Sequence, residues 1–126
     1  MIFIDTNYFL RFLLADITPQ YTKAKTLFLS AAEGKKIVFT STIVIFELYW
    51  VFTSFYEKNK KEVASILEQI LAMHFVKIDE RNVLSDAVSL YKKSTFDLED
   101  AYNLSFAKAK GAKKFKTFDK KLLRAF

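Results

Sequence analysis

Short apolar runs along the chain alternate with longer stretches in which apolar and polar positions are mixed. Runs of a few β-branched or aromatic residues are typical of buried strands. The pattern predicts four of them, at Ile2–Ile4, at "KIVFT" from Lys36, at "HFVKI" from His74 and at "KFKTF" from Lys114. Because helical stretches lie between these runs, the pattern favours a parallel sheet with helices on both faces.

The mixed stretches have the spacing of helices with one apolar face, or of one buried helix in the middle of the chain. The predicted helices lie at about Thr6–Leu14, from near Pro19 to Glu33, and at about Thr40–Tyr56, Lys60–Met73, Glu80–Lys93, Leu98–Lys110 and Asp119–Arg124. Glycine follows two of them, as is common at helix ends. With 126 residues and no linker or repeat, the chain is expected to form a single domain, 1–126.

Three aspartates follow or begin elements that such a fold would bring to one edge of the sheet. Asp5 follows the first strand, Asp119 follows the fourth, and Asp100 lies in the first turn of a helix. Ligands of parallel sheets bind beyond the carboxyl ends of the strands. Each aspartate has an ordinary alternative, because Asp is favoured at helix starts for capping and for the helix dipole.

Glu47 favours a site, because it lies inside the apolar stretch "STIVIFELYWVF" and is not at a helix start. A buried carboxylate costs several kcal/mol unless it is paired or bound to a metal. No Lys or Arg lies near it along that helix, although a partner from elsewhere in the chain stays open. A cation shared with the three aspartates would account for all four carboxylates.

Composition excludes several other chemistries. The chain has no cysteine, so disulfides and thiolate metal sites are absent, and its one histidine, His74, cannot form a histidine acid–base pair. Two glycines, Gly34 and Gly111, cannot form a glycine-rich phosphate loop, so a nucleotide cofactor is not expected. Carboxylates without Cys or His ligands select a hard cation, Mg²⁺ or Mn²⁺. The start "MIFIDTN" has no signal-peptide pattern and no run is long enough to span a membrane, so we expect a cytoplasmic protein.

Positive charge gathers at the C-terminal end. The last 19 residues carry eight basic residues and one acidic residue, a net charge of +7, whereas the whole chain carries +6. The segment that includes Lys113, Lys114, Lys116 and Lys120 is therefore a candidate RNA-binding surface, with an ordinary solvated face as the alternative. Aromatic residues are abundant, and Tyr49, Trp50, Phe52, Phe55 and Tyr56 are expected in the core or at a dimer surface.

Four motifs, in order and spacing, resemble those of the PIN-domain ribonucleases, especially the VapC-type toxins of toxin–antitoxin pairs. They are "FIDTN", a Glu in a central apolar helix, "DLEDAYNLSFAKAKGA" and "KTFDKKL". The resemblance covers essentially the whole chain. It implies a three-layer α/β/α sandwich with a central parallel sheet of four or five strands, and metal-dependent endoribonuclease activity that leaves a 5′-phosphate.

The resemblance places the catalytic positions at Asp5, Glu47, Asp100 and Asp119, with Asp5 and Asp100 as metal ligands. Asn7 and Thr117 match supporting polar positions, and each could equally make local hydrogen bonds. Asp97 lies three residues before Asp100 and could be confused with it. We predict that Asp97 is the helix N-cap and that Asp100 is the site residue.

The resemblance further implies an RNA substrate, a small antitoxin protein as partner and a homodimer. PIN domains also serve in RNA maturation, so that alternative to a toxin stays open, as does a catalytically silent PIN-like RNA-binding module. A receiver-like signalling domain would need an acidic pair after the first strand, which "DTN" lacks. The sequence does not identify the RNA target, the cleavage sequence or the number of metal ions.

Overall fold

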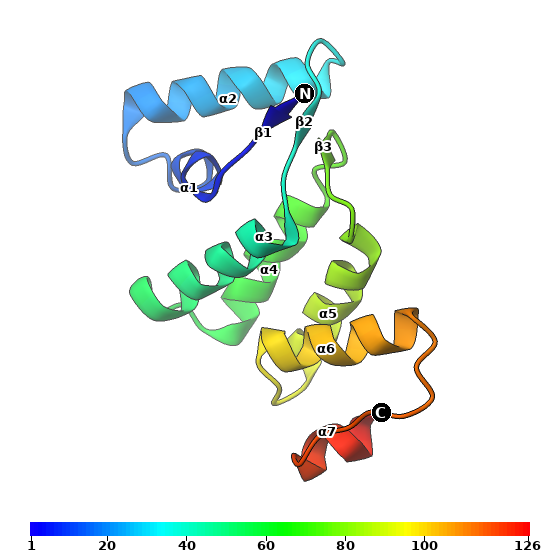
Figure 1. Ribbon diagram of the computed structural model, residues 1–126. Coiled ribbons are helices and arrows are strands. Elements are labelled where there is room, and N and C mark those ends of the chain that lie inside the picture. The colour runs from blue at the N-terminus through cyan, green and yellow to red at the C-terminus, as the bar shows by residue number, and fades with distance from the viewer.

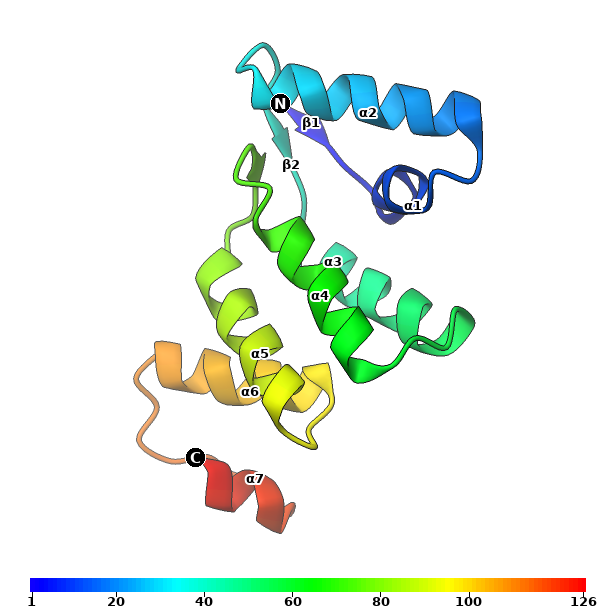
Figure 2. The ribbon, with the colours of Figure 1, turned by 180° about the vertical axis from the view of Figure 1, so that it is seen from behind.

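The computed structural model describes all residues, 1–126. It is a mostly helical α/β structure with three short strands: β1 (Ile2–Phe3), β2 (Val38–Phe39) and β3 (Val76–Lys77). They form one parallel sheet in the order β1-β2-β3 (Figures 1 and 2). Ile2 pairs with Val38, which in turn pairs with Val76. The prediction of a parallel sheet is confirmed, although each strand is shorter than its apolar run.

Seven α-helices and one π-helical turn account for most of the chain. They are α1 (Thr6–Leu14), α2 (Thr18–Ala32), α3 (Thr42–Trp50), the π-helical turn η1 (Val51–Phe55), α4 (Lys60–Leu71), α5 (Arg81–Lys93), α6 (Leu98–Ala109) and α7 (Lys120–Ala125). All seven predicted helices are present. The long central one continues from α3 into η1, and Gly34 and Gly111, at positive φ angles of 77° and 75°, follow the ends of α2 and α6. None of the helices combines the length and the hydropathy that a membrane span requires.

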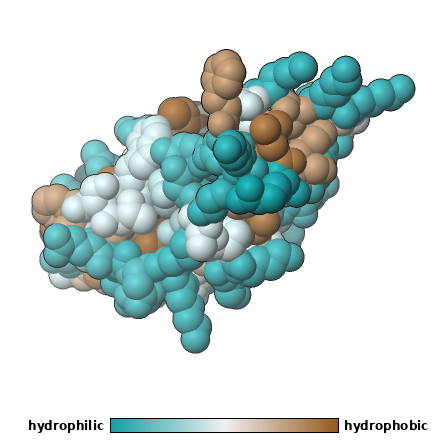
Figure 3. Space-filling model, turned by 90° about the horizontal axis from the view of Figure 1, so that it is seen from below, coloured by the Kyte–Doolittle hydropathy of each residue, from teal (hydrophilic) through white to brown (hydrophobic).

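Helix α1 packs on α2 near the strands, while α4 packs on α5 and α5 on α6. One cluster of 25 buried residues extends from Ile4 to Ala101 and joins these elements. Buried Leu122 of α7 lies outside that cluster. In both ribbon views α7 lies at the opposite end of the molecule from β1. Seen from the end that carries α7, the surface is largely hydrophilic, with hydrophobic side chains in separate patches (Figure 3).

The fourth strand predicted at "KFKTF" is not present, and neither a fourth nor a fifth strand joins the sheet. Lys114 and Lys116 alternate with half-buried Phe115 and Thr117, so the segment has only one inward face. A central strand of a parallel sheet is buried on both faces. Phe115 packs instead on Phe126 beside α7, with the two ring centroids 5.4 Å apart. The segment therefore packs beside α7, away from the sheet.

Candidate functional site

Asp5 begins helix α1 as its N-cap. Its backbone is extended, with φ −86° and ψ 167°, and its Oδ1 accepts a hydrogen bond of 2.8 Å from the N–H of Thr6. The carboxylate is exposed, and Oδ2 has no hydrogen-bond partner within the chain. Next to it, the Thr6 hydroxyl is buried without a partner. Asp5 therefore caps α1 and still has one oxygen available for a ligand.

Asp97 and Asp100 begin helix α6. Asp97 is the N-cap, and its Oδ1 accepts a hydrogen bond of 2.8 Å from the N–H of Asp100. The prediction that Asp97 caps the helix is thus confirmed. Capping by Asp97 leaves the half-buried Asp100 carboxylate free of this structural task. The two neighbouring aspartates therefore differ in role, and Asp100 remains the better candidate ligand.

Asp100 lies among other carboxylates. Burial raises the pKa of its carboxyl above the ordinary value, and the charges of Asp97, Asp119 and Glu99 raise it further. The chain contains three salt bridges, none of which involves these groups. A negative cluster without a salt bridge favours binding of an added cation, and shifted pKa values of this kind are common at functional sites.

Asp119 reaches this cluster from the start of α7. It is the N-cap of α7, accepting hydrogen bonds of 2.8 Å from the N–H of Lys121 and 3.3 Å from that of Leu122. Its own N–H donates to Thr117 Oγ1 at 3.1 Å. Thr117 therefore fixes the turn before α7, which is the local hydrogen bonding that was one of its two expected roles. The charge of Asp119 also acts on the Asp100 carboxyl, so the two side chains lie in one region of the molecule.

Glu47 lies on α3 and is half-buried. The expectation that its helix has no exposed face is wrong, because Ile43 and Trp50, four residues before and three after it, are 55% and 40% exposed. Such spacing places all three on one side of the helix. The Glu47 carboxylate forms no salt bridge and no hydrogen bond within the chain, so the alternative of a paired carboxylate is not observed. Its charge remains available to a ligand.

Glu99 is a further candidate site residue, which the sequence analysis did not single out. Its Oε2 accepts a hydrogen bond of 3.2 Å from the indole N–H of Trp50, while its Oε1 is buried without any partner. The neighbouring residues make a second contact: the Tyr49 hydroxyl accepts a weak hydrogen bond of 3.4 Å from the N–H of Leu98. Burial raises the pKa of the Tyr49 hydroxyl, and the charge of Glu99 adds to this. These contacts join the end of α3 to the start of α6.

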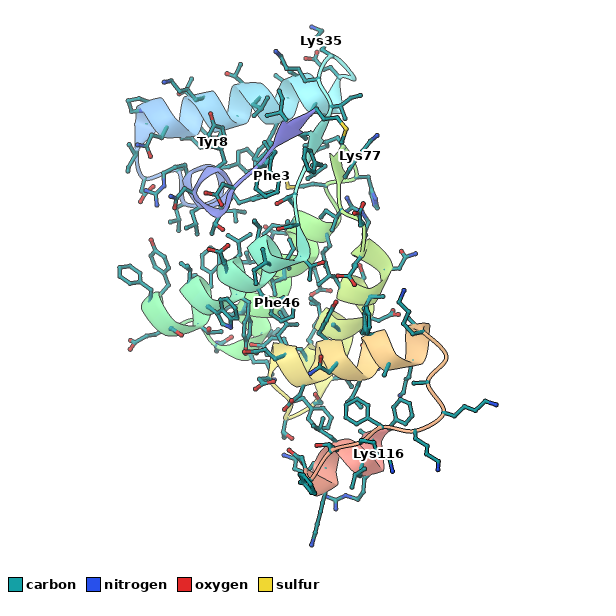
Figure 4. All side chains as sticks on the ribbon, viewed as in Figure 1. Phe3, Tyr8, Lys35, Phe46, Lys77 and Lys116 are labelled. Atoms are coloured by element: carbon teal, nitrogen blue, oxygen red, sulfur yellow. The ribbon has the colours of Figure 1, made fainter.

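The remaining predicted residues lie at the surface. Asn7, in the first turn of α1, is exposed and lines a cleft with Tyr8 and Arg11. The four lysines predicted to bind RNA are all exposed, and Figure 4 shows Lys116 beside α7; they are Lys113, Lys114, Lys116 and Lys120. His74 is exposed and lines a different cleft with Glu68 and Arg81.

The four predicted carboxylates do not form one metal cage. No three His, Cys, Asp or Glu side chains lie close enough together to hold a metal ion. The missing fourth strand offers a physical reason. Without that strand, Asp119 lies near α6 and not at the edge of the sheet where Asp5 begins α1. The donor chemistry nevertheless fits a hard divalent cation, since every candidate ligand is a carboxylate and Glu99 Oε1 is an orphaned buried acceptor.

The parallel sheet, the helices that follow its strands and the acidic helix starts define an α/β protein with a candidate cation-binding site. The family model of the PIN domain matches residues 2–125, and the chain belongs to this family. PIN domains are generally nucleases, so the family indicates a nuclease-type function. No curated protein and no solved structure matches the chain significantly.

Proposed function

We propose that this PIN-domain protein is a metal-dependent endoribonuclease, the toxin of a type II toxin–antitoxin pair, which hydrolyses RNA phosphodiester bonds with Mg²⁺ or Mn²⁺. One observation carries the proposal: within a PIN domain that spans residues 2–125, burial and the charges of three other carboxylates raise the pKa of the Asp100 carboxyl, which forms no salt bridge. Such a cluster reduces stability unless a ligand compensates its charge.

The four carboxylates take two roles in the proposed site. Asp5 and Asp100 are the direct ligands, because one Asp5 oxygen is free and Asp97 caps α6 in place of Asp100. Glu47 and Asp119 orient the attacking water. When bound, the cation eases deprotonation of that water and offsets the charge that develops on the phosphate. Asn7 steadies the substrate side of Asp5, and Thr117 positions Asp119 through the bond to its N–H.

The proposed working state contains the fourth strand of a PIN sheet, formed by residues 114–118 against β1. The outer edge of β1 is free: the N–H groups of Ile2 and Ile4 donate to the carbonyls of Ile37 and Phe39, at and just before β2. The N–H of Phe3, which lies between them, therefore points outward. Phe3 is 48% exposed and Phe118 is fully exposed. Pairing would cover both rings and bring Asp119 to the sheet edge near Asp5. Because β1 and α7 lie at opposite ends of the molecule, we place the pairing between two copies, as a homodimer.

The antitoxin is proposed to be a small protein, and the setting of both proteins is the cytoplasm. An apolar cleft of about 260 Å³ between α1, α2 and β3, lined by Phe12, Phe28, Leu29 and Phe75, offers a surface for such a partner. The competing proposals are a nuclease of RNA maturation, which would lack the antitoxin, and a silent module that binds RNA without cleaving it.

The central test is an RNA cleavage assay with Mg²⁺ or Mn²⁺, with and without EDTA, on the wild type and Asp5→Asn. We expect cleavage by the wild type, its loss in EDTA and its loss in the variant. Asp86→Asn is the matched control, since Asp86 is an exposed carboxylate on α5 that lines another cleft. Equal cleavage by wild type and Asp5→Asn would overturn the site. RNA binding without any cleavage would favour the silent module.

A cysteine pair tests the fourth strand, because the chain has no native cysteine. The double variant Phe3→Cys/Thr117→Cys should form a disulfide under mild oxidation that joins two chains on a non-reducing gel. The control is Phe3→Cys/Ser85→Cys, in which the second cysteine replaces an exposed serine of α5. It should remain monomeric. Failure of the first pair to crosslink faster than the control would exclude the proposed strand.

A further inference from the structure

Two adjoining clefts form a groove between α1 and α2. The larger, of about 580 Å³, is lined by Asn7, Tyr8, Arg11, Ile17, Gln20 and Lys23. The smaller, of about 360 Å³, extends along α2 to Lys36. Tyr8 and Lys23 line both clefts, so the two are continuous, and we call them the α1/α2 groove. In Figure 4, Tyr8 lies between the two helices.

The lining of the α1/α2 groove is positive. It contains Arg11, Lys23 and Lys36 and no Asp or Glu. Lys23 and Lys36 form no salt bridge, while Arg11 pairs with Asp16 at 3.1 Å in an exposed contact of the kind that contributes little to stability. The clefts at α4/α5 and α5/α6 each contain a carboxylate, Glu68 and Asp86 respectively. The charge of the α1/α2 groove is therefore suited to a polyanion.

The groove also has an aromatic wall and a defined position. The Tyr8 ring is 39% exposed and forms no hydrogen bond within the chain, so its face and hydroxyl are available. Asn7, at one end of the groove, lies two residues after Asp5 in the first turn of α1. Aromatic rings flanked by cations are the usual means of binding single-stranded nucleic acids, because bases stack on the ring and cations contact the phosphates.

We propose that the α1/α2 groove binds single-stranded RNA on one side of the cleaved phosphate. A base stacks on Tyr8, Lys23 and Lys36 contact phosphates, and Asn7 marks the end nearest the cleaved bond. The proposal rests on the proposed nuclease function and names its substrate class. It also assigns the principal RNA contacts to this groove rather than to the C-terminal lysines. A duplex would not stack on Tyr8, because its bases are already paired and stacked.

The test measures binding of the full chain to a fluorescein-labelled single-stranded RNA of about 10 nucleotides, in EDTA so that no cleavage occurs. Lys23→Ala should raise Kd by about three- to tenfold and lower the salt dependence by about one unit of slope. Lys25→Ala is the matched control. Lys25 is an exposed lysine two residues along the same helix that lines the apolar cleft instead. Equal Kd values for the two variants would overturn the proposal.

Tyr8 provides a second, independent readout. Tyr8→Ala should raise Kd by about tenfold, whereas Tyr8→Phe, which retains the ring, should bind like the wild type. Thermal unfolding of each variant checks that the fold is retained, and if Tyr8→Ala does not fold, the lysine pair decides. Unlabelled single-stranded RNA should compete with the probe, while duplex RNA of the same sequence should not. Equal competition by the duplex would contradict the stacking model.

The outcomes separate this proposal from the proposed function. If the wild type binds RNA through Lys23 and Tyr8 but does not cleave it with Mg²⁺ or Mn²⁺, the groove stands and the nuclease proposal fails. If the wild type cleaves RNA while both variants bind normally, the groove is wrong and the nuclease stands. If Lys113→Ala/Lys114→Ala alone abolishes binding, the C-terminal segment is the RNA surface and the groove proposal is wrong.

Discussion

Asp5 and Asp100 are both acidic residues at helix starts, yet their surroundings differ. Asp5 is exposed, caps its own helix and lies beside a groove lined by cations. Asp100 is half-buried, leaves the capping to Asp97 and lies among carboxylates that raise its pKa. The first arrangement is stable by itself. The second combines burial and like charge, both of which disfavour the ionised form.

This difference distinguishes an aspartate that the helix itself requires from one that a ligand would require. A helix start explains one aspartate at the beginning of α6, and Asp97 fills that role. Capping does not explain Asp100, or Glu99, whose Oε1 is buried without a partner. Buried acceptors and like charges persist where a ligand compensates them, so the acidic side of the site is expected to depend on a cation. The groove near Asp5 is expected to depend on the RNA.

The largest predicted effect is on cleavage. In the proposed nuclease, Asp100→Asn should lower kcat by about 10²–10³-fold, because a neutral amide replaces a charged ligand in the site. It should leave RNA affinity in EDTA within about twofold of the wild type, since Asp100 does not line the groove. A rise in Kd equal to the fall in cleavage would show that Asp100 acts in RNA binding instead, and the comparison would fail.

A smaller effect is predicted for the bond between Trp50 and Glu99. Trp50→Phe removes the indole N–H that donates to Glu99 at 3.2 Å and so frees both Glu99 oxygens. We expect cleavage to fall by about 10-fold, because residues that orient a metal ligand or its neighbours typically contribute this much. Mg²⁺ affinity, followed by thermal unfolding, should change in parallel. Phe55→Leu is the control, as Phe55 is exposed on η1.

Much of this fold follows from local patterns. The helices were predictable because their apolar positions recur with helical spacing, and α6 because Asp97 and Asp100 mark its first turn. The absence of the fourth strand was not predictable, because a strand forms only when a neighbouring strand is available for hydrogen bonding. "KFKTF" has strand-like alternation, but only the three-dimensional structure shows that Phe115 packs on Phe126 and not beside β1. Local sequence contains no information about which apolar partner is nearest.

The candidate site divides in the same way. Asp100 and Asp119 could be paired from sequence, as each begins a helix near the end of the chain. Glu99 could not, because its importance lies in the contact with Trp50, 49 positions away. The exposed side of α3 was also missed: hydrophobic Ile43 and Trp50 suggested burial around Glu47, yet both reach the surface. Residue type predicts burial poorly where an aromatic or aliphatic side chain lies at an edge of the core.

A third prediction tests Asp97 as the N-cap of α6. Asp97→Ala should lower the free energy of unfolding by about 1 kcal/mol, as loss of an N-cap usually does. Asp97→Ser should restore most of this stability, because a hydroxyl also accepts the bond from the N–H of Asp100. Chemical denaturation measures both. Equal stability of Asp97→Ala and the wild type would show that relief of charge at Asp100 offsets the whole contribution of the cap.

The smallest predicted effect concerns pH. A raised pKa in the folded state means that Asp100 binds its proton more tightly there than in the unfolded chain, so stability falls as pH rises from the ordinary value of 3.8 through the raised value. Asn at this position carries no such charge. Asp100→Asn should therefore be more stable than the wild type near neutral pH, by up to about 1 kcal/mol, and the two should converge below about pH 3.8. Thermal unfolding across this range checks the difference.

Added Mg²⁺ should reverse the order near neutral pH, because it compensates the charge that only the wild type carries. The wild type should then gain stability with Mg²⁺ concentration, whereas Asp100→Asn should gain little. If Mg²⁺ stabilises both proteins equally, the cation binds elsewhere, and the acidic cluster at α6 is not the cation site. If Asp100→Asn is less stable than the wild type without Mg²⁺, the Asp100 carboxylate makes a stabilising contact and the contrast with Asp5 disappears.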